Sequence, residues 1–241
     1  KVCPIPDIEI ETLLKNLRKA FLFNAFDPKD LAVLQPLQIS LALQCQVNEF
    51  IYEESIEETK AVKALETKLA KSTAINCGEY AYHIACLGSY RILSQYHWSK
   101  SLEHLHSIED LYRRLILEPS KEVDIRKSIP RFGVLKNKTS KMVRKQYEES
   151  PYPRWINTAV EPVPYSIPNF LSRTGLRVVQ NDRHLSKSPE ILVAGCGTGQ
   201  NAIATASCFQ NCFVTAFDLS LTSLAYAKRK TDELNLRNID Y

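Results

Sequence analysis

The chain has 241 residues, of which 44% are hydrophobic and 24% charged, and its formal net charge is +4. This length and composition fit a soluble protein of two parts with a sizeable core, and no apolar run reaches the roughly 18 residues that cross a bilayer. The amino-terminal residues also lack the pattern of a secretory signal, so we expect a cytoplasmic protein without a membrane partner.

Helical periodicity dominates residues 1–120, which we predict to form a helical domain. Asp7 is a candidate N-cap for the first helix, whose apolar stripe begins at Ile10. Further helices are predicted over residues 31–52, 57–71 and 76–95. A shorter helix is expected to begin with Ser107 as its cap and to end before Pro119, because proline does not fit a helix interior. No convincing 34-residue repeat is present.

Residues 121–160 are predicted to be a linker, and its first half is strongly basic. Nine basic residues and two acids lie between Lys121 and Lys145, which gives this stretch a net charge of +7. Such a stretch is either a solvated connector, the interpretation that we favour, or a site for an acidic partner or nucleic acid. Aromatic residues that could stack on bases are sparse, since Phe132 is alone before Tyr147.

The linker ends in a segment rich in proline and aromatic residues, Gln146-Tyr-Glu-Glu-Ser-Pro-Tyr-Pro-Arg-Trp155. Its two prolines fix φ on either side of an aromatic residue and hold Arg154 and Trp155 in a defined geometry. The sequence is compatible with two roles for this segment. The segment is a lid over a ligand, or it is a structural clasp that packs the helical domain against the domain that follows.

The most informative motif lies in the last predicted domain, residues 161–241. An apolar run from Ile191 leads into three alternating glycines, Gly195-Cys196-Gly197-Thr198-Gly199. Glycine adopts positive φ and lets a ligand approach the backbone, and the helix that follows offers free N–H groups to polar ligand atoms. A dinucleotide-binding G-x-G-x-x-G pattern would need its third glycine at position 200, where the chain has Gln200.

The elements after the glycine loop follow the order of a βαβ unit. They are a helix from Asn201 to about Cys208, a strand over Phe213–Phe217, and a helix capped by Ser220 that runs to about Leu236. Asp218 ends the strand, nineteen residues after Gly199. Its carboxylate can accept two hydrogen bonds from a vicinal diol.

This combination of glycine loop and acid resembles the class I S-adenosylmethionine-dependent methyltransferases. Residues 143–155 and 217–227 are similar to a bacterial subgroup that is often fused to tetratricopeptide repeats, and residues 44–50 resemble the helical region before its catalytic domain. The resemblance implies an α/β fold, in which an N-terminal α-helical region precedes the first half of a Rossmann-like methyltransferase sheet. It also implies S-adenosylmethionine as the cofactor.

The resemblance further implies which residues bind that cofactor. The loop residues Gly195, Cys196, Gly197, Thr198 and Gly199 would pack against its methionine portion. Asp218 would bind the ribose hydroxyls, and Leu219 would join the site. If the segment before the sheet closes as a lid, Tyr147 or Arg154 would contact the methionine carboxylate. Many family members carry an acid two residues before the first glycine, where this chain has Val193, and Glu190 is the candidate substitute.

The sequence stops at Tyr241, where a third strand begins, so we expect a fragment of a longer protein. The complete family fold has strands in the order 3-2-1-4-5-7-6, and strands 4 onward would be missing. These strands usually carry the residues that orient the methyl acceptor, so no catalytic residue is named and the piece alone is expected to be inactive. A protein or a small molecule is the favoured acceptor, the helical region could bind a protein partner, and the basic linker leaves nucleic acid open.

Two other functions compete with methyl transfer. A nicotinamide-dependent dehydrogenase would share the strand, the loop and the acid, but the misplaced third glycine counts against it. A noncatalytic scaffold would bind partners through the helical region and keep a degenerate nucleotide-binding half-domain.

Cysteine and histidine residues give no signal of a metal or redox site. The seven cysteines include no C-x-x-C pair, so we expect reduced thiols. Cys196 is expected to fill the glycine turn and not to act as a nucleophile. The spacing of His97, His104 and His106 matches no metal-binding signature.

Overall fold

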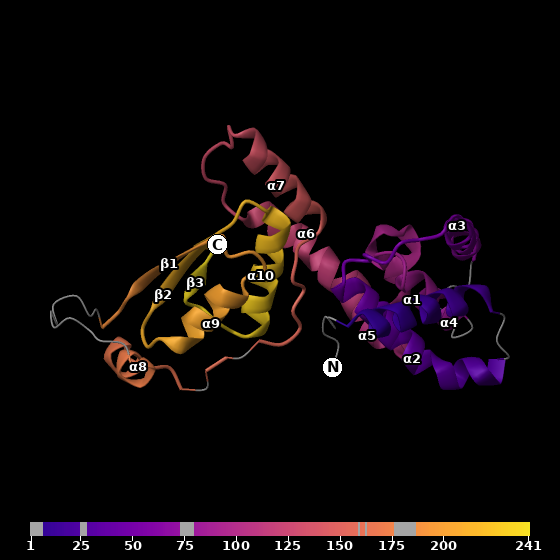
Figure 1. The fold of residues 1–241 in the computed structure, drawn as a ribbon, viewed down its shortest axis with the longest axis horizontal. Helices are drawn as coiled ribbons and strands as arrows, with labels where there is room; N and C mark the ends of the chain where they lie inside the picture. The colour runs from indigo at the N-terminus through magenta and orange to yellow at the C-terminus, as the bar shows by residue number, and fades with distance from the viewer. Residues whose placement is uncertain (1–6, 25–27, 73–79, 159, 162, 176–186) are drawn as a thin grey trace. The chain divides into compact units, whose positions relative to one another are not determined.

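A computed structural model of the chain describes residues 7–24, 28–72, 80–158, 160–161, 163–175 and 187–241 (Figure 1). The chain divides into two compact units, residues 1–121 and 122–241. Helix α6 (Glu118–Ser128) crosses the division between them. Residues 122–160, most of the stretch predicted to be a linker, therefore belong to the second unit.

The first unit is helical. Its longer helices are α1 (Ile8–Phe23), α2 (Pro28–Val47), α3 (Ile56–Lys71) and α4 (Ala81–Gly88). Short turns follow, namely η2 (Leu93–Gln95), η3 (His97–Leu102), η4 (His106–Ile108), α5 (Glu109–Tyr112) and the π-helical turn η5 (Arg113–Leu117). Branched aliphatic side chains from these elements, such as Ile84, Leu93 and Leu111, are fully buried in one core.

Two helix caps show how the sequence sets the helix starts. The carboxylate of Asp7 accepts hydrogen bonds from the backbone N–H groups of Glu9 and Ile10, at 2.9 and 3.0 Å, which confirms its prediction as the cap of α1. Ser55 and Glu58 form a capping box at the start of α3, where each side chain accepts a hydrogen bond from the backbone N–H of the other.

A buried ion pair joins α1 to α3. Arg18 is 1% exposed, and its Nη2 atom donates to Oε1 of Glu58 at 3.2 Å. The hydroxyl of Tyr90 donates to the same oxygen at 2.9 Å, and the guanidinium carbon of Arg18 lies 4.2 Å from the centre of the Tyr90 ring. The two charges are thus desolvated together and share one aromatic neighbour.

Three expectations for this unit were wrong. Pro119 does not end a helix, because helical structure continues from Glu109 to Ser128 through the π-helical turn η5; the wider turn accommodates a residue that lacks an N–H group. Ser107 caps no helix, since α5 begins at Glu109 and the Ser107 carbonyl accepts a hydrogen bond from Gln35. The helix predicted over 76–95 is shorter: α4 ends at Gly88, a residue of low helix propensity, and Leu93–Gln95 form a separate short turn. Residues 76–79 lie outside the described residues.

The second unit contains a small parallel sheet and the helices around it. After α6 come α7 (Lys138–Glu149), α8 (Ile167–Thr174), β1 (Glu190–Ala194), α9 (Gln200–Cys208), β2 (Phe213–Phe217), α10 (Leu221–Glu233) and β3 (Ile239–Asp240). The strand order is β1-β2-β3, and both neighbouring pairs are parallel. These elements confirm the predicted α/β fold class, with a helical region before a partial Rossmann-like sheet.

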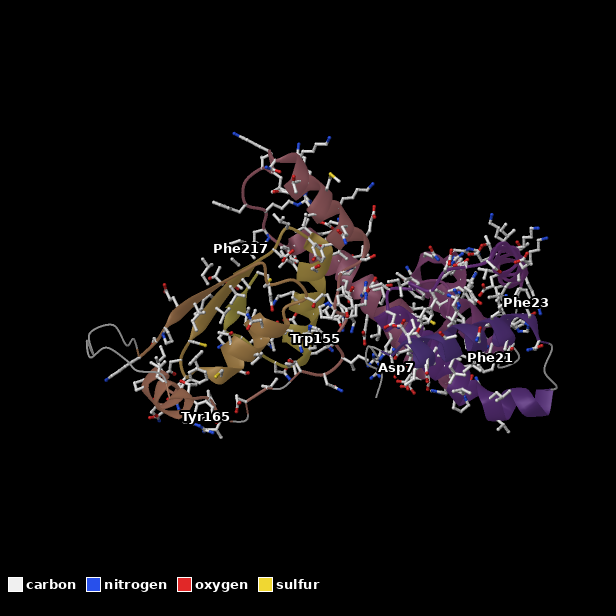
Figure 2. All side chains as sticks on the ribbon, in the orientation of Figure 1. Asp7, Phe21, Phe23, Trp155, Tyr165 and Phe217 are labelled. Carbon is white, nitrogen blue, oxygen red and sulfur yellow. The ribbon has the colours of Figure 1, made fainter. Side chains whose placement is uncertain are left out.

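Alternation along the strands gives the sheet one covered and one open face. Val214, Ala216 and Ile239 are buried in a core with side chains of α9 and α10, and these two helices lie on the same side of the sheet in Figure 1. Leu192 and Phe217 point to the other face and are more than half exposed; Figure 2 labels Phe217 at the end of β2. Among the described residues, no helix combines the length and apolarity that a membrane span requires.

Candidate functional site

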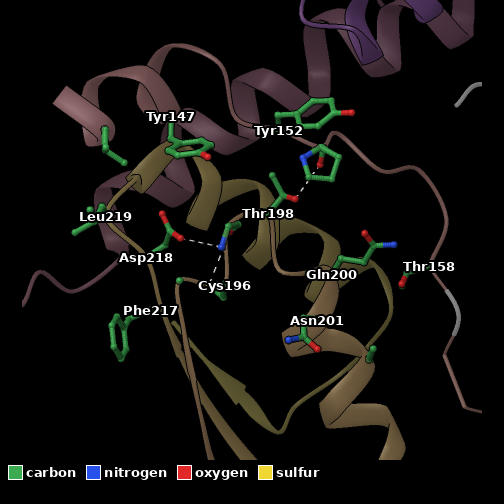
Figure 3. Close-up of a pocket in the computed structure, with 15 residues that line it drawn as sticks. Tyr147, Tyr152, Thr158, Cys196, Thr198, Gln200, Asn201, Phe217, Asp218 and Leu219 are labelled. Carbon is green, nitrogen blue, oxygen red and sulfur yellow. Dashed lines mark hydrogen bonds between the residues drawn. The ribbon is translucent and has the colours of Figure 1, made fainter. Parts of the chain in front are cut away.

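A pocket of about 860 Å³ opens at the carboxyl ends of β1 and β2 (Figure 3). Its walls come from α7, from residues 152–158, from the glycine loop, from the start of α9 and from the turn after β2. Seven of the nine residues predicted to bind the cofactor line it, namely Tyr147, Gly195, Cys196, Gly197, Thr198, Asp218 and Leu219. Gly199 and Arg154 are not among the lining residues.

The three glycines of the loop have different structural roles. All three have positive φ, at 68° for Gly195, 52° for Gly197 and 82° for Gly199. A Cβ atom on Gly195 or Gly197 would meet no atom of the described residues within 4 Å, so their backbone faces open space at the pocket. A Cβ atom on Gly199 would lie 2.5 Å from Cβ of Ala227 in α10. Gly199 therefore allows close packing between helices, and the first two glycines leave room for a ligand.

Asp218 holds the glycine loop at the end of the sheet. Its Oδ2 atom accepts a hydrogen bond from the N–H of Gly197 at 2.9 Å, and its Oδ1 atom accepts one from the N–H of Ser220, also at 2.9 Å. An ionised carboxylate has about four acceptor positions, so each oxygen can accept a further bond from a ligand hydroxyl. The carboxylate faces the pocket next to the loop (Figure 3).

The proline-rich segment before the sheet clasps the same loop. Thr198 donates through its hydroxyl to the Pro153 carbonyl at 2.8 Å, and the Trp155 indole donates to the Thr198 carbonyl at 3.0 Å. Thr198 and Trp155 are both buried, and the Tyr226 hydroxyl of α10 donates to the Trp155 carbonyl. This clasp acts within the second unit. Its residues Tyr152 and Pro153 also form part of the pocket wall.

The structure does not bring Arg154 into the pocket. Its guanidinium lies 3.5 Å from the carboxylate of Glu122 in α6 and over the ring of Tyr226. Glu122 is also bound by Arg229 of α10, at 2.9 Å, and both of these side chains are buried. Arg154 thus joins a buried charged cluster between α6 and α10, which the local sequence around it does not indicate.

Glu190 does not replace the acid that this chain lacks at Val193. It begins β1, whereas the glycine loop follows the last residue of that strand, Ala194. Four residues of strand separate the two positions by about 13 Å, so the Glu190 carboxylate lies at the opposite end of the sheet from the pocket.

Sequence reasoning missed Glu148, which connects α7 to the start of α10. Its carboxylate accepts hydrogen bonds from the N–H of Leu221 at 2.9 Å and the hydroxyl of Thr222 at 2.6 Å, and it pairs with Arg126 at 3.0 Å. Burial alone would raise the pKa of Glu148, but these hydrogen bonds and Arg126 outweigh burial and lower the pKa below its usual value. A carboxylate at a helix amino terminus also interacts favourably with the helix dipole.

Eight further residues of the pocket were not among those predicted to bind the cofactor. They are Val143, Tyr152, Pro153, Thr158, Gln200, Asn201, Ala204 and Phe217. Val143 precedes the predicted Tyr147 by four residues on α7, so helical spacing alone could have indicated it. Gln200 and Asn201 follow the glycine loop directly and form the first turn of α9.

Cys196 behaves as a buried structural residue of the loop. Desolvation, with a contribution from the charge of Asp218, raises the pKa of its thiol to about 12. The thiol therefore stays protonated near neutral pH, which agrees with a turn-filling role. Across the described residues, no group of three or more His, Cys, Asp or Glu side chains is placed to hold a metal ion.

Comparison with known families supports methyl transfer as the general chemistry of this unit. Residues 191–241 match the family model described as a methyltransferase domain. The match runs from β1 to Tyr241 and includes both the glycine loop and Asp218. Searches of curated proteins and of solved structures found no significant match.

Proposed function

We propose that the second unit binds S-adenosylmethionine and belongs to an enzyme that transfers its methyl group to an acceptor. One observation carries the proposal. The open backbone of Gly195 and Gly197 and the carboxylate of Asp218 border a single pocket at the end of a parallel sheet. A nucleoside fits this arrangement because its ribose diol can bond to the carboxylate and the loop leaves room for atoms that a Cβ would exclude.

The charge of the pocket favours this cofactor over a dinucleotide. Asp218 is the one charged side chain among the residues that the structure places around the pocket, and three aromatic side chains, Tyr147, Tyr152 and Phe217, accompany it. A carboxylate and ring faces attract a sulfonium cation. A pyrophosphate would meet no lysine or arginine among these lining residues, so its two charges would be less well compensated.

The amino end of α9 suits the single carboxylate of the methionine portion. Gln200 and Asn201 line the pocket from the first turn of this helix. Backbone N–H groups of a first turn have no partner within their helix and favour a negative charge. We therefore assign cofactor contacts to the loop residues 195–198, to Asp218 and Leu219 at the nucleoside end, and to the start of α9.

S-adenosylmethionine supplies an electrophilic methyl group on a positively charged sulfur when it is bound. The residues of this chain bind and orient: the clasp formed by Pro153 and Trp155 fixes the loop, and Tyr147 of α7 covers the pocket from one side. Orientation and exclusion of water are the largest contributions that a protein makes to such a displacement. We assign no catalytic residue.

Further proposals rest on the sequence resemblance. The similarity of residues 143–155 and 217–227 favours the bacterial subgroup often fused to tetratricopeptide repeats, and with it a cytoplasmic location. A protein or small-molecule acceptor and a protein partner for the helical unit are also expected on this basis.

Calorimetric titration of S-adenosylhomocysteine into the 241-residue chain tests the cofactor assignment. We expect a dissociation constant in the micromolar range and at least tenfold weaker binding by Asp218→Ala, because two bonds to a charged acceptor are lost. Asp218→Asn keeps one oxygen in place, so it controls for loss of the loop bond from Gly197. Asp232→Ala removes an exposed acid of α10 and should bind as the wild type does.

The contrary results are equally clear. A folded chain that takes up no S-adenosylhomocysteine, or that binds NADH more tightly, would overturn the cofactor assignment. Circular dichroism spectra of each variant establish that the chain is folded.

A further inference from the structure

The stretch from Ile125 to Tyr147, which we call the basic segment, contains eight lysine and arginine residues and no acid. It comprises the end of α6, the connection to α7 and most of α7 itself. A run of this kind needs anions from elsewhere in the protein or from a partner.

Three acids of the second unit pair with four of these eight cations. Arg126 and Arg144 both pair with Glu148, Lys127 pairs with Asp124, and Lys145 pairs with Glu149. The other four are Arg131, Lys136, Lys138 and Lys141. Each of them is exposed, and none has an acidic partner in the ranges that the structure describes.

Apolar side chains stand among these four cations. Phe132 is fully exposed, Val134 is 86% exposed and Met142 is 65% exposed. Single exposed apolar residues are ordinary, but three within eleven residues give this basic stretch apolar as well as charged groups for a partner to contact.

The basic segment lies at the same end of the second unit as the pocket. Helix α7 contacts the start of α10, where the Ser220 hydroxyl donates a hydrogen bond to the Tyr147 carbonyl at 2.9 Å. Val143 and Tyr147 of the same helix line the pocket, beside the carboxyl ends of the strands (Figures 1 and 3). Lys138, Lys141 and Lys145 recur at helical spacing on α7, so a row of cations runs along the helix whose other flank forms the pocket wall.

We propose that the basic segment binds single-stranded nucleic acid and leads it to the pocket. Phosphates spaced along a strand match the four cations that have no acidic partner among the described residues, and flat bases match the exposed rings of Phe132, Tyr147 and Tyr152. The acidic side chains of a peptide would satisfy the cations, but they offer no stacking partner to those rings. The inference that the bound strand is also the methyl acceptor rests on the proposed function, whereas its binding does not.

Fluorescence anisotropy with labelled 12-nucleotide oligo-U and oligo-dT tests the binding. We expect the logarithm of the association constant to fall with the logarithm of salt concentration with a slope of about −3, from four phosphate contacts. The triple variant Lys136→Gln/Lys138→Gln/Lys141→Gln should lower that slope by about 2. Lys60→Gln/Lys63→Gln/Lys71→Gln changes the net charge equally on exposed positions of α3 and should bind as the wild type does.

Substitution of Phe132 separates stacking from apolar contact. Phe132→Leu keeps an apolar side chain but removes the ring, and we expect it to weaken oligonucleotide binding about fivefold or more. Because the side chain is fully exposed, the variant should fold as the wild type does. A lipid surface or a protein groove would tolerate leucine at this position.

Three results would overturn the inference: no oligonucleotide binding, equal affinity for a poly-glutamate peptide or for phosphatidylserine vesicles, or wild-type affinity in Phe132→Leu. Titration of S-adenosylhomocysteine into the same preparations keeps the two proposals apart. Cofactor binding without oligonucleotide binding removes only the nucleic-acid inference. Oligonucleotide binding without cofactor binding removes the proposed function and leaves the basic segment as a nucleic-acid site.

Discussion

The indole N–H of Trp155 donates a 3.0 Å hydrogen bond to the carbonyl of Thr198, 43 residues further along the chain. Both residues are buried, and the hydroxyl of Thr198 returns a bond to the Pro153 carbonyl. A segment outside the sheet therefore fixes the conformation of the loop that borders the pocket.

Removal of that hydrogen bond should weaken ligand binding as well as the fold, because it releases the loop that borders the pocket. Trp155→Phe retains an aromatic ring but leaves the Thr198 carbonyl without its donor, at a cost of about 1–3 kcal/mol. We expect affinity for S-adenosylhomocysteine to fall at least fivefold, as measured by calorimetry. Trp98→Phe is the matched control, since the Trp98 indole N–H has no hydrogen-bond partner among the described residues. Equal affinities in the two variants would contradict the role of the clasp.

The loop glycines should separate stability from binding. Gly199→Ala places a Cβ 2.5 Å from Ala227 at a φ of 82°, so we expect a loss of about 2–4 kcal/mol in the free energy of unfolding. Gly195→Ala meets no atom, and strain at positive φ should cost it about 1 kcal/mol, while its methyl group enters ligand space. Urea denaturation and cofactor titration of both variants measure the two effects. The reverse order of stabilities would contradict the assignment of Gly199 to packing.

Stability at acid pH should depend on Glu148. Its pKa is lower in the folded protein, so the stabilisation that it provides is complete above the unfolded pKa of about 4.3 and is lost as pH falls through the folded value. Glu148→Gln should therefore be less stable than the wild type by about 1–2 kcal/mol at pH 7, and the difference should shrink toward pH 3. Urea denaturation at both pH values measures it. A difference that is constant with pH would contradict the role of the charge.

In the helical unit, loss of Glu58 should leave the Arg18 charge buried without its partner. We expect Glu58→Ala to lower the free energy of unfolding by about 3–5 kcal/mol. Arg18→Met/Glu58→Leu removes both charges and should recover much of that loss, because apolar side chains fill the same space. Glu57→Ala, at an exposed position of the same helix, should keep a melting temperature close to that of the wild type. A double variant less stable than Glu58→Ala would contradict this account.

Alkylation should distinguish the buried thiol of the loop from a more accessible one. With a pKa of about 12, Cys196 has about one thiolate in ten thousand at pH 8, and its side chain is buried. Cys208 is more exposed. Peptide mapping after iodoacetamide treatment should therefore find Cys208 modified before Cys196. Faster modification of Cys196 would indicate an activated thiol, against its assignment as a turn residue.

Local signals in the sequence predicted the parts of the fold that local interactions determine. The glycine pattern, the acid after the second strand and the cap residue Ser220 lie within one βαβ unit, and the structure has each of these elements in the predicted place. The Ser220 hydroxyl accepts the N–H of Ser223 at 3.1 Å, as expected for a cap. The prediction that Asp7 caps α1 is confirmed for the same reason, since its hydrogen-bond partners are two and three residues away.

Features that depend on distant partners escaped prediction. The sequence allows Arg154 to contact a ligand or to form a structural ion pair. In the structure it pairs with Glu122, which also binds Arg229, and these two residues lie 32 and 75 positions away from it in the sequence. Glu148 likewise finds its partner helix more than seventy residues later. The prediction that a helix ends before Pro119 was wrong because a π-helical turn, which no local rule indicates, keeps the helix continuous.

The position of Trp155 also gives this protein an optical probe of its own. The chain has two tryptophans, and the other, Trp98, belongs to the first unit. In a Trp98→Phe chain all indole fluorescence comes from a ring that is hydrogen-bonded to the glycine loop. Changes in that loop therefore alter the emission spectrum without any attached dye. The same clasp that holds the pocket in shape therefore reports, by its fluorescence, what enters the pocket.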